Sequence, residues 1–206
     1  MKHRINPLRT ALGLALALSV CGPLPVALAA LATPGPQAVD SLPGESLYQV
    51  QADLTDQHGR QLQWSALRGQ PQLVSMFYAN CHLMCPLILE NAKALQKQLG
   101  EDGARLGVAV LTLDPARDTP EALAAVAADH RTPDVWRYLR PEPDAVRALA
   151  SVLGVRYRFR EDGSINHTSV LVLLDAEGRE VARSEVTGIA PDPAFLQQVR
   201  TLLAAD

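Results

Sequence analysis

Two cysteines stand four positions apart in the segment Cys81-His82-Leu83-Met84-Cys85-Pro86. The preceding run, residues 72–78, has the length and the β-branched and aromatic content of a strand buried on both faces. Pro86 predicts the first residue of a helix, which puts Cys85 at the helix cap and Cys81 in the loop before it. Because a helix N-terminus carries partial positive charge, we expect both thiols to ionise more easily than a free cysteine. Such thiolates exchange disulfides or bind metals, whereas a structural disulfide across so short a gap would constrain little chain entropy.

A third group is needed to separate the redox interpretation from the metal interpretation. His167 lies in a predicted loop before a strand expected over residues 168–174, which in a thioredoxin-like topology starts beside the helix that follows the cysteines. Without that context it would be a surface or capping histidine. Two thiolates and an imidazole suit Cu(I) and are tolerated by Cu(II) and Zn(II), although structural zinc normally takes a fourth protein ligand. Cys81, Cys85 and His167 are therefore the candidate metal ligands. Cys81 and Cys85 are also the candidate redox pair, with Cys81 expected to attack because the loop exposes it.

The elements that must position these residues alternate along the chain. Strands are predicted over residues 47–54, 61–64, 72–78, 106–113, 136–139, 155–159, 168–174 and 180–186, and helices over 86–99, 118–128, 144–153 and 193–204. The first two strands flank a turn sequence at residues 56–59 and predict a β-hairpin. Strand–helix alternation followed by a second hairpin and a terminal helix is typical of an α/β protein with a thioredoxin-like fold, here with an N-terminal β-hairpin extension.

The first 29 residues have the three parts of an export signal. An apolar run, residues 10–20, follows three basic residues and precedes a small-x-small motif that ends at residue 29. The alternative is an uncleaved N-terminal anchor, because residues 10–32 are long enough to span a bilayer, which takes about 20 residues. Residues 30–45, rich in Pro, Gly and Ala, predict a flexible tether, and residues 46–206 predict a single domain.

Export would place the domain in an oxidising compartment, expected to be the periplasm, with the protein released or anchored to the inner membrane. Loss of residues 1–29 removes three of the 19 basic residues and no acidic one, so the net charge falls from −3 to −6. This acidic balance argues against nucleic-acid partners. No heptad or long apolar patch is visible in the sequence, so we expect a monomer.

The chain resembles the Sco/SenC family across most of residues 46–203. The resemblance rests on LVSMFYANCHLMCPLI around the cysteines, LDPARDTPEAL at residues 113–123 and NHTSVLVLLDAEG at residues 166–178. It implies a thioredoxin-like metallochaperone that binds one copper ion, Cu(I) or Cu(II), through Cys81, Cys85 and His167. The implied acceptor is the binuclear copper site of cytochrome c oxidase subunit II, or another copper-accepting protein. The alternative is an enzyme, a thiol-disulfide reductase that keeps the acceptor's cysteines reduced.

Some residues depart from the family pattern or have roles that the resemblance leaves open. His82 and Met84 stand in a segment where many members have Pro-Asp-Val, and they are either extra ligands or ordinary loop substitutions. Asn166 stands where members often have Asp before the histidine, which weakens the expectation of a carboxylate that orients His167. Asp114 is either an outer residue of the metal site or a capping aspartate. The C-x-x-x-C spacing and the lack of a proline beside His167 favour metal over thioredoxin-type redox chemistry.

Overall fold

The computed structural model describes residues 42–81 and 84–205. The predicted export segment, residues 1–29, and most of the predicted tether lie outside the described residues. The last residues of that tether contact the domain, since Leu42 packs against the core and Glu45 forms an ion pair of 2.9 Å with Arg179. The domain therefore begins by Leu42, four residues earlier than the sequence predicts. Among the described residues, no helix has the length and apolar composition needed to cross a bilayer.

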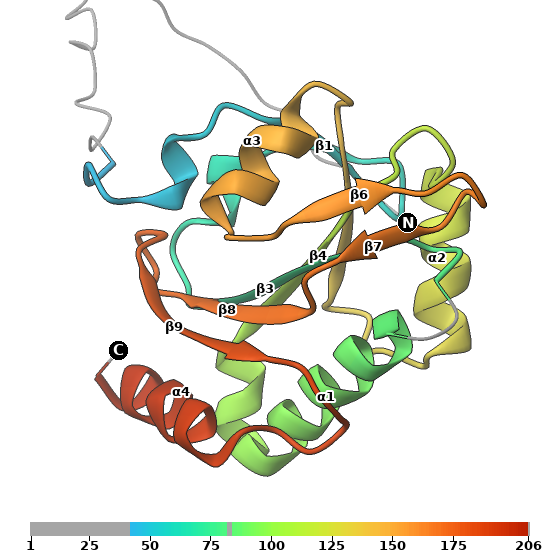
Figure 1. Cartoon of the computed structure of the whole chain (residues 1–206). Coiled ribbons are helices and arrows are strands. Elements are labelled where there is room, and N and C mark those ends of the chain that lie inside the picture. Colours follow the sequence, from blue (N-terminus) through green and yellow to red (C-terminus); the bar gives the residue numbers. More distant parts are fainter. Residues whose placement is uncertain (1–41, 82–83, 206) are drawn as a thin grey trace, which may run out of the picture. The chain divides into compact units, whose positions relative to one another are not determined.

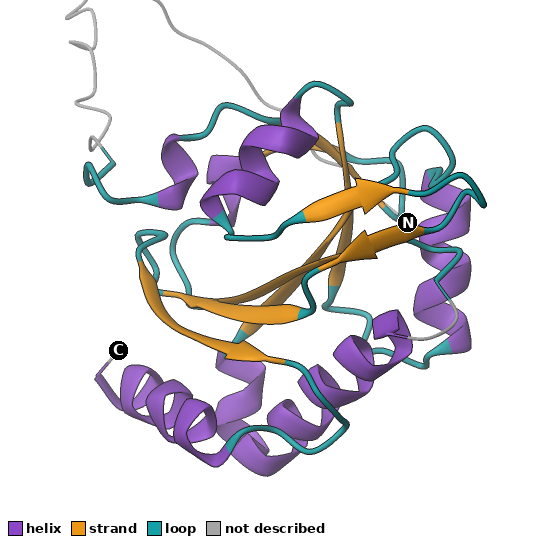
Figure 2. Cartoon of the chain, viewed as in Figure 1, coloured by secondary structure: helices purple, strands orange, loops and turns teal. Residues whose placement is uncertain are grey.

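A seven-stranded mixed sheet forms the centre of the domain (Figures 1 and 2). Its order is β2 (Gln61–Gln63), β1 (Asp53–Asp56), β5 (Arg137–Pro141), β4 (Gly107–Thr112), β3 (Gln72–Phe77), β8 (Val170–Leu174) and β9 (Glu180–Glu185). The three central strands β3, β4 and β5 are parallel, and the other pairs are antiparallel. The predicted thioredoxin-like α/β fold is confirmed, and the N-terminal hairpin β1–β2 joins the main sheet through β5.

Helices cover both faces of this sheet. They are α1 (Met84–Leu99), α2 (Pro120–Asp129), α3 (Ala145–Val152) and α4 (Pro193–Ala205), and three short 3₁₀ helices lie at Leu47–Gln49, Trp64–Leu67 and Gly100–Arg105. Figure 1 shows α1 and α4 along one side of the sheet and α3 on the other. Every residue of β3 and β8 is buried between these layers. Because each fully buried aliphatic side chain contributes about 1.5–3 kcal/mol, these strands hold the cysteine loop on a rigid base.

Two predicted elements differ from the structure. Residues Leu47–Gln49 form a 3₁₀ helix instead of the start of a strand, because the Ser46 hydroxyl accepts a hydrogen bond from the Tyr48 amide and Tyr48 packs edge-on against Trp64. Helix α1 includes Cys85 in its first turn, so Pro86 is not its first residue. Pro86 is compatible with this position because the first-turn amides of a helix have no intrahelical partner.

The strand predicted over residues 155–159 is confirmed over residues 157–159, but its pairing with a second strand in a sheet separate from the main one was not predicted. This two-stranded sheet consists of β6 (Tyr157–Phe159) and β7 (Ile165–His167), with Tyr157 opposite His167 in the register. The hairpin turns at Gly163, whose φ of 78° favours glycine. His167 is therefore the last residue of a strand and not part of a loop, and the chain runs from it directly into β8 (Figure 1).

Candidate metal-binding site

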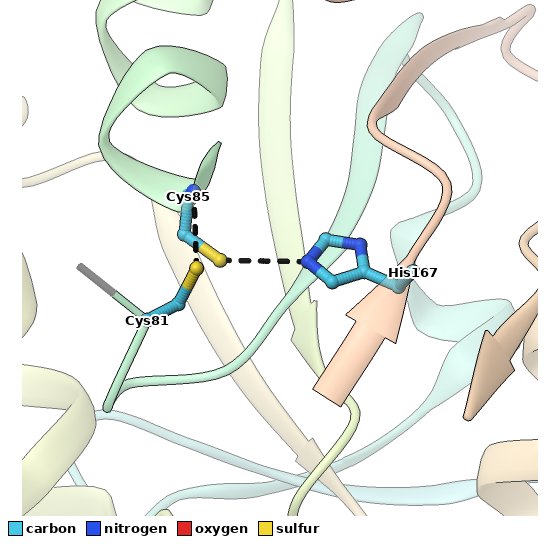
Figure 3. Close-up of side chains that lie close together, drawn as sticks. All are labelled: Cys81, Cys85 and His167. Carbon is cyan, nitrogen blue, oxygen red and sulfur yellow. Dashed lines mark hydrogen bonds between the residues drawn. The ribbon is translucent and has the colours of Figure 1, made fainter. Parts of the chain in front are cut away.

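The structure brings the three predicted ligands together at one end of the sheet (Figure 3). Cys81 lies in the loop after β3, Cys85 in the first turn of α1, and His167 at the end of β7. The two sulfurs and the nearer ring nitrogen all lie within 4.8 Å of one another. Cys85 Sγ lies 3.6 Å from His167 Nε2. Residues 82 positions apart thus form one cluster of soft donor atoms.

A backbone carbonyl orients the imidazole of His167. Nδ1 lies 3.0 Å from the carbonyl oxygen of Thr168, and since a carbonyl only accepts, Nδ1 carries the proton and donates it. Nε2 then has a free lone pair that faces the sulfurs, which is the tautomer a metal ligand needs. Asn166 is exposed and points to the other face of β7, so the orienting group is the next carbonyl and not residue 166. The ring of Tyr78 packs edge-on against His167 at a centroid distance of 6.0 Å.

The two thiols differ in exposure and in hydrogen bonding. Cys85 is 3% exposed, whereas Cys81 is half-buried. The Cys85 amide donates a hydrogen bond of 3.3 Å to Cys81 Sγ, so this first-turn amide of α1 stabilises negative charge at Cys81. The hydrogen bond with Cys81 and burial raise the pKa of the Cys85 thiol, contrary to the prediction that both thiols ionise more easily. A metal that binds here must displace the proton of Cys85, because coordination requires the thiolate.

The site opens into a cavity of about 410 Å³ beside the β6–β7 hairpin. Cys81, Met84 and His167 line this cavity, whereas the buried Cys85 does not. Two donors of the site are therefore accessible from one side and the third is shielded. His82, the other unassigned residue between the cysteines, lies outside the described residues.

Asp114 lies outside the cluster and acts on the hairpin through Arg117. Its carboxylate is buried, its Oδ2 accepts a hydrogen bond from Arg117 Nε, and its amide donates to Thr112 Oγ1 at 2.9 Å. The Arg117 guanidinium also donates to the Gly163 carbonyl, 2.8 Å away at the hairpin turn. The half-exposed Arg117, held by the buried Asp114 carboxylate, thus ties the strand pair that carries His167 to the loop after β4.

Asp118, which the sequence predicts only as the first residue of a helix, supports the loop that carries Cys81. Thr119 is the residue that caps α2, and Asp118 is 2% exposed beneath the cysteine loop. Its Oδ2 accepts hydrogen bonds from the Ala79 amide at 2.9 Å and from the Thr112 hydroxyl. Burial raises the pKa of this carboxyl. Because Ala79 opens the loop that leads to Cys81, Asp118 fixes the start of that loop.

Fold and site together define a thioredoxin-like α/β domain with an accessible Cys–Cys–His donor cluster where a sheet strand meets a helix. The chain belongs to the SCO1/SenC family, whose sequence model matches residues 42–204. A putative copper-binding protein of Stutzerimonas stutzeri is 28% identical over 133 residues, which are 62% of this chain and 64% of that protein. The SCO1 protein homolog of Bacillus subtilis is 27% identical over 128 residues, which are 60% of this chain and 66% of that protein. The aligned part of this chain thus spans about two thirds of the length of both relatives.

Solved structures show the same fold. Copper-bound ScoI of Bradyrhizobium japonicum superposes with a TM-score of 0.63 at 21% identity, covering 74% of this chain and 97% of that one. Copper-bound yeast Sco1 gives a TM-score of 0.62 at 20% identity, covering 76% of this chain and 88% of that one. These similarities establish the thioredoxin-like architecture around the cysteine loop and the histidine.

Proposed function

We propose that this protein binds one copper ion through Cys81, Cys85 and His167 and delivers it to the binuclear copper site of cytochrome c oxidase subunit II. Copper binding is supported by two sulfurs and an imidazole, protonated at Nδ1, whose donor atoms lie within 4.8 Å of one another. The copper-binding description of the Stutzerimonas stutzeri relative and the copper-bound Sco structures support the choice of metal. The choice of cytochrome c oxidase subunit II as the acceptor is based on membership of the SCO1/SenC family.

The donor set fits copper better than zinc. Thiolates and imidazole are soft or borderline ligands, and Cu(I) binds them readily. A structural zinc site normally takes four protein ligands, and among the described residues the cluster contains three His, Cys, Asp or Glu side chains. One face of the site remains open toward the cavity, so a donor from another protein can approach the metal from there.

Delivery would proceed by ligand exchange at the open face. An acceptor thiolate binds copper while the carrier's ligands release it one at a time, so the ion stays coordinated throughout and keeps its oxidation state. We further propose that the protein acts as a monomer after export to the periplasm, released or anchored to the inner membrane by its N-terminal segment. Its acidic net charge argues against nucleic acid as a partner.

Copper transfer to a purified acceptor tests this function. The chain loaded with one Cu(I) is mixed with the copper-free soluble domain of cytochrome c oxidase subunit II, and the proteins are then separated and assayed for copper. Because the acceptor site is binuclear, we expect it to fill after two equivalents of loaded chain. Transfer should continue when a chelator that traps free Cu(I) is present. Copper that stays on the carrier, or reaches the acceptor only without the chelator, would contradict direct delivery.

One observation favours a second function, reduction of the acceptor's disulfide. Cys81 is the more accessible thiol, and its sulfur accepts a hydrogen bond from the Cys85 amide. Exposure and a hydrogen-bond donor that stabilises the thiolate are the conditions for a nucleophilic cysteine. Attack by Cys81 would form a mixed disulfide, and Cys85 would resolve it, so the chain's dithiol is oxidised to a disulfide while the acceptor disulfide is reduced to two thiols. Two electrons pass between the proteins in this step. The histidine variant described in the Discussion separates the two functions.

Loss of the Arg117 contact with the hairpin is expected to weaken copper binding. In Arg117→Met the Gly163 carbonyl loses its donor, so the strand that presents His167 is less well fixed. We expect about tenfold weaker Cu(I) binding, which is the lower end of the range seen when residues that orient metal ligands are substituted. The measurement is competition with a calibrated Cu(I) chelator.

A matched control comes from the opposite end of the main sheet. Arg60 pairs with the buried Asp56 in the β1–β2 turn, much as Arg117 pairs with Asp114, but it contacts neither cysteine loop nor hairpin in the structure. Arg60→Met should lower stability to a similar degree and leave copper affinity unchanged. If both variants bound copper like the wild type, Arg117 would have a structural role alone.

A further inference from the structure

The side chain of Met84 faces the same cavity as two donors of the site. Met84 is the first residue of α1, is half-buried, and lines the cavity of about 410 Å³ with Cys81 and His167. Its neighbour Cys85 is buried and does not line the cavity. Consecutive helical residues point about 100° apart, so one turn of helix sends Cys85 toward the core and Met84 toward the cavity.

The chemistry of the cavity wall singles out this thioether. Of the described residues that line it, only Met84 adds a soft donor to those of Cys81 and His167. Asp162 and Ser164 offer hard oxygen atoms, which Cu(I) binds poorly. A methionine side chain has three rotatable bonds, so its sulfur can follow a metal over a short path. A thioether also has no proton to lose on binding, unlike the Cys85 thiol.

The geometry points to Met84 as a fourth, weakly held copper ligand on the open side of the Cys81, Cys85 and His167 site. This assignment rests on the proposed copper-binding function and deepens it. Met84 keeps the ion coordinated when the bond between copper and His167 Nε2 breaks and an acceptor thiolate forms its bond. Copper remains Cu(I) and the imidazole leaves neutral, so no electron moves in this exchange.

Selenomethionine labelling of the full chain tests the assignment directly. The chain has three methionines, and Met76 is fully buried in β3, so X-ray absorption at the copper edge can detect selenium bonded to copper at residue 84. We expect a copper–selenium scattering contribution in the labelled wild type loaded with one Cu(I). The labelled Met84→Leu variant should lack it, which also excludes Met1 as its source. Leucine conserves the side-chain volume, so the helix start should fold normally.

Affinity provides a second, independent measurement. We expect Met84→Leu to bind Cu(I) about fivefold more weakly in chelator competition. The effect is small because thioethers bind copper weakly, through long bonds. Full copper loading without a selenium contribution, together with unchanged affinity in Met84→Leu, would overturn the role of Met84 and leave the three-donor site intact. Failure of the wild type to bind any copper would overturn both proposals.

Discussion

Cys85→Ser is expected to abolish stoichiometric copper binding. Cys85 is the buried thiol of the cluster and lies 3.6 Å from His167 Nε2, and a serine hydroxyl neither ionises near neutral pH nor acts as a soft ligand. Loss of a metal ligand should weaken binding more than loss of a residue that only hydrogen-bonds to a ligand. We therefore expect the affinity for Cu(I) to fall more than about 100-fold. Copper stoichiometry after chelator competition measures this loss.

The serine variant should still fold. A hydroxyl at residue 85 is close in size to the thiol and can donate a hydrogen bond to His167 Nε2, so the buried position keeps a polar partner. An unchanged circular dichroism spectrum and a thermal midpoint near that of the wild type would establish this. One equivalent of copper bound at wild-type affinity by the folded variant would place the metal elsewhere.

His167→Ala is the second substitution with a large expected effect, and it separates copper binding from redox chemistry. It removes the only nitrogen donor of the described cluster and leaves both thiols in place. Affinity for Cu(I) should fall about 100-fold or more, because two thiolates alone then hold the ion. Disulfide reduction should persist, since thiol exchange needs Cys81 and Cys85 and not the imidazole.

Two assays on the same preparations give the comparison. Chelator competition reports copper affinity, and reduction of a model disulfide reports dithiol activity. His58→Ala is the matched control, since His58 is exposed in the β1–β2 turn at the opposite end of the main sheet and should change neither result. Wild-type copper affinity in His167→Ala would remove the argument for a metal site. Loss of disulfide reduction in that variant would count against the reductase alternative.

Much of the architecture follows from local patterns in the sequence. The buried strands β3, β4 and β8 are predominantly apolar, and the start of α2 has a capping threonine followed by proline, so these elements have strong local signals. The β6–β7 hairpin has a weaker signal: a strand was predicted at β6, but Arg158 and Phe159 are both exposed, so β6 does not alternate between an apolar and a polar face, and β7 is only three residues long. Its formation depends on the glycine turn and on contacts with the rest of the domain.

The members of the Cys–Cys–His cluster were predictable, but its electrostatics were not. The spacing of Cys81 and Cys85, together with the expected thioredoxin-like topology, was sufficient to name the two cysteines and His167 as candidate ligands that lie close together. The raised pKa of Cys85 arises from its hydrogen bond with Cys81 and from burial under the loop, which depend on tertiary packing. The contact from Arg117 to Gly163 joins residues 46 positions apart, and the sequence between them gives no sign of it.

The two parts of the metal site belong to different sheets, with the thiols on the main sheet and its helix and the imidazole on the small β6–β7 pair. An ion bound by all three would act as a reversible cross-link that closes a loop of 82 residues. Copper binding would then rigidify the domain, and loss of copper would release that constraint. The copper-free and copper-bound forms would thus differ in internal motion as well as in composition, so any protein that binds this face would meet two forms of different rigidity.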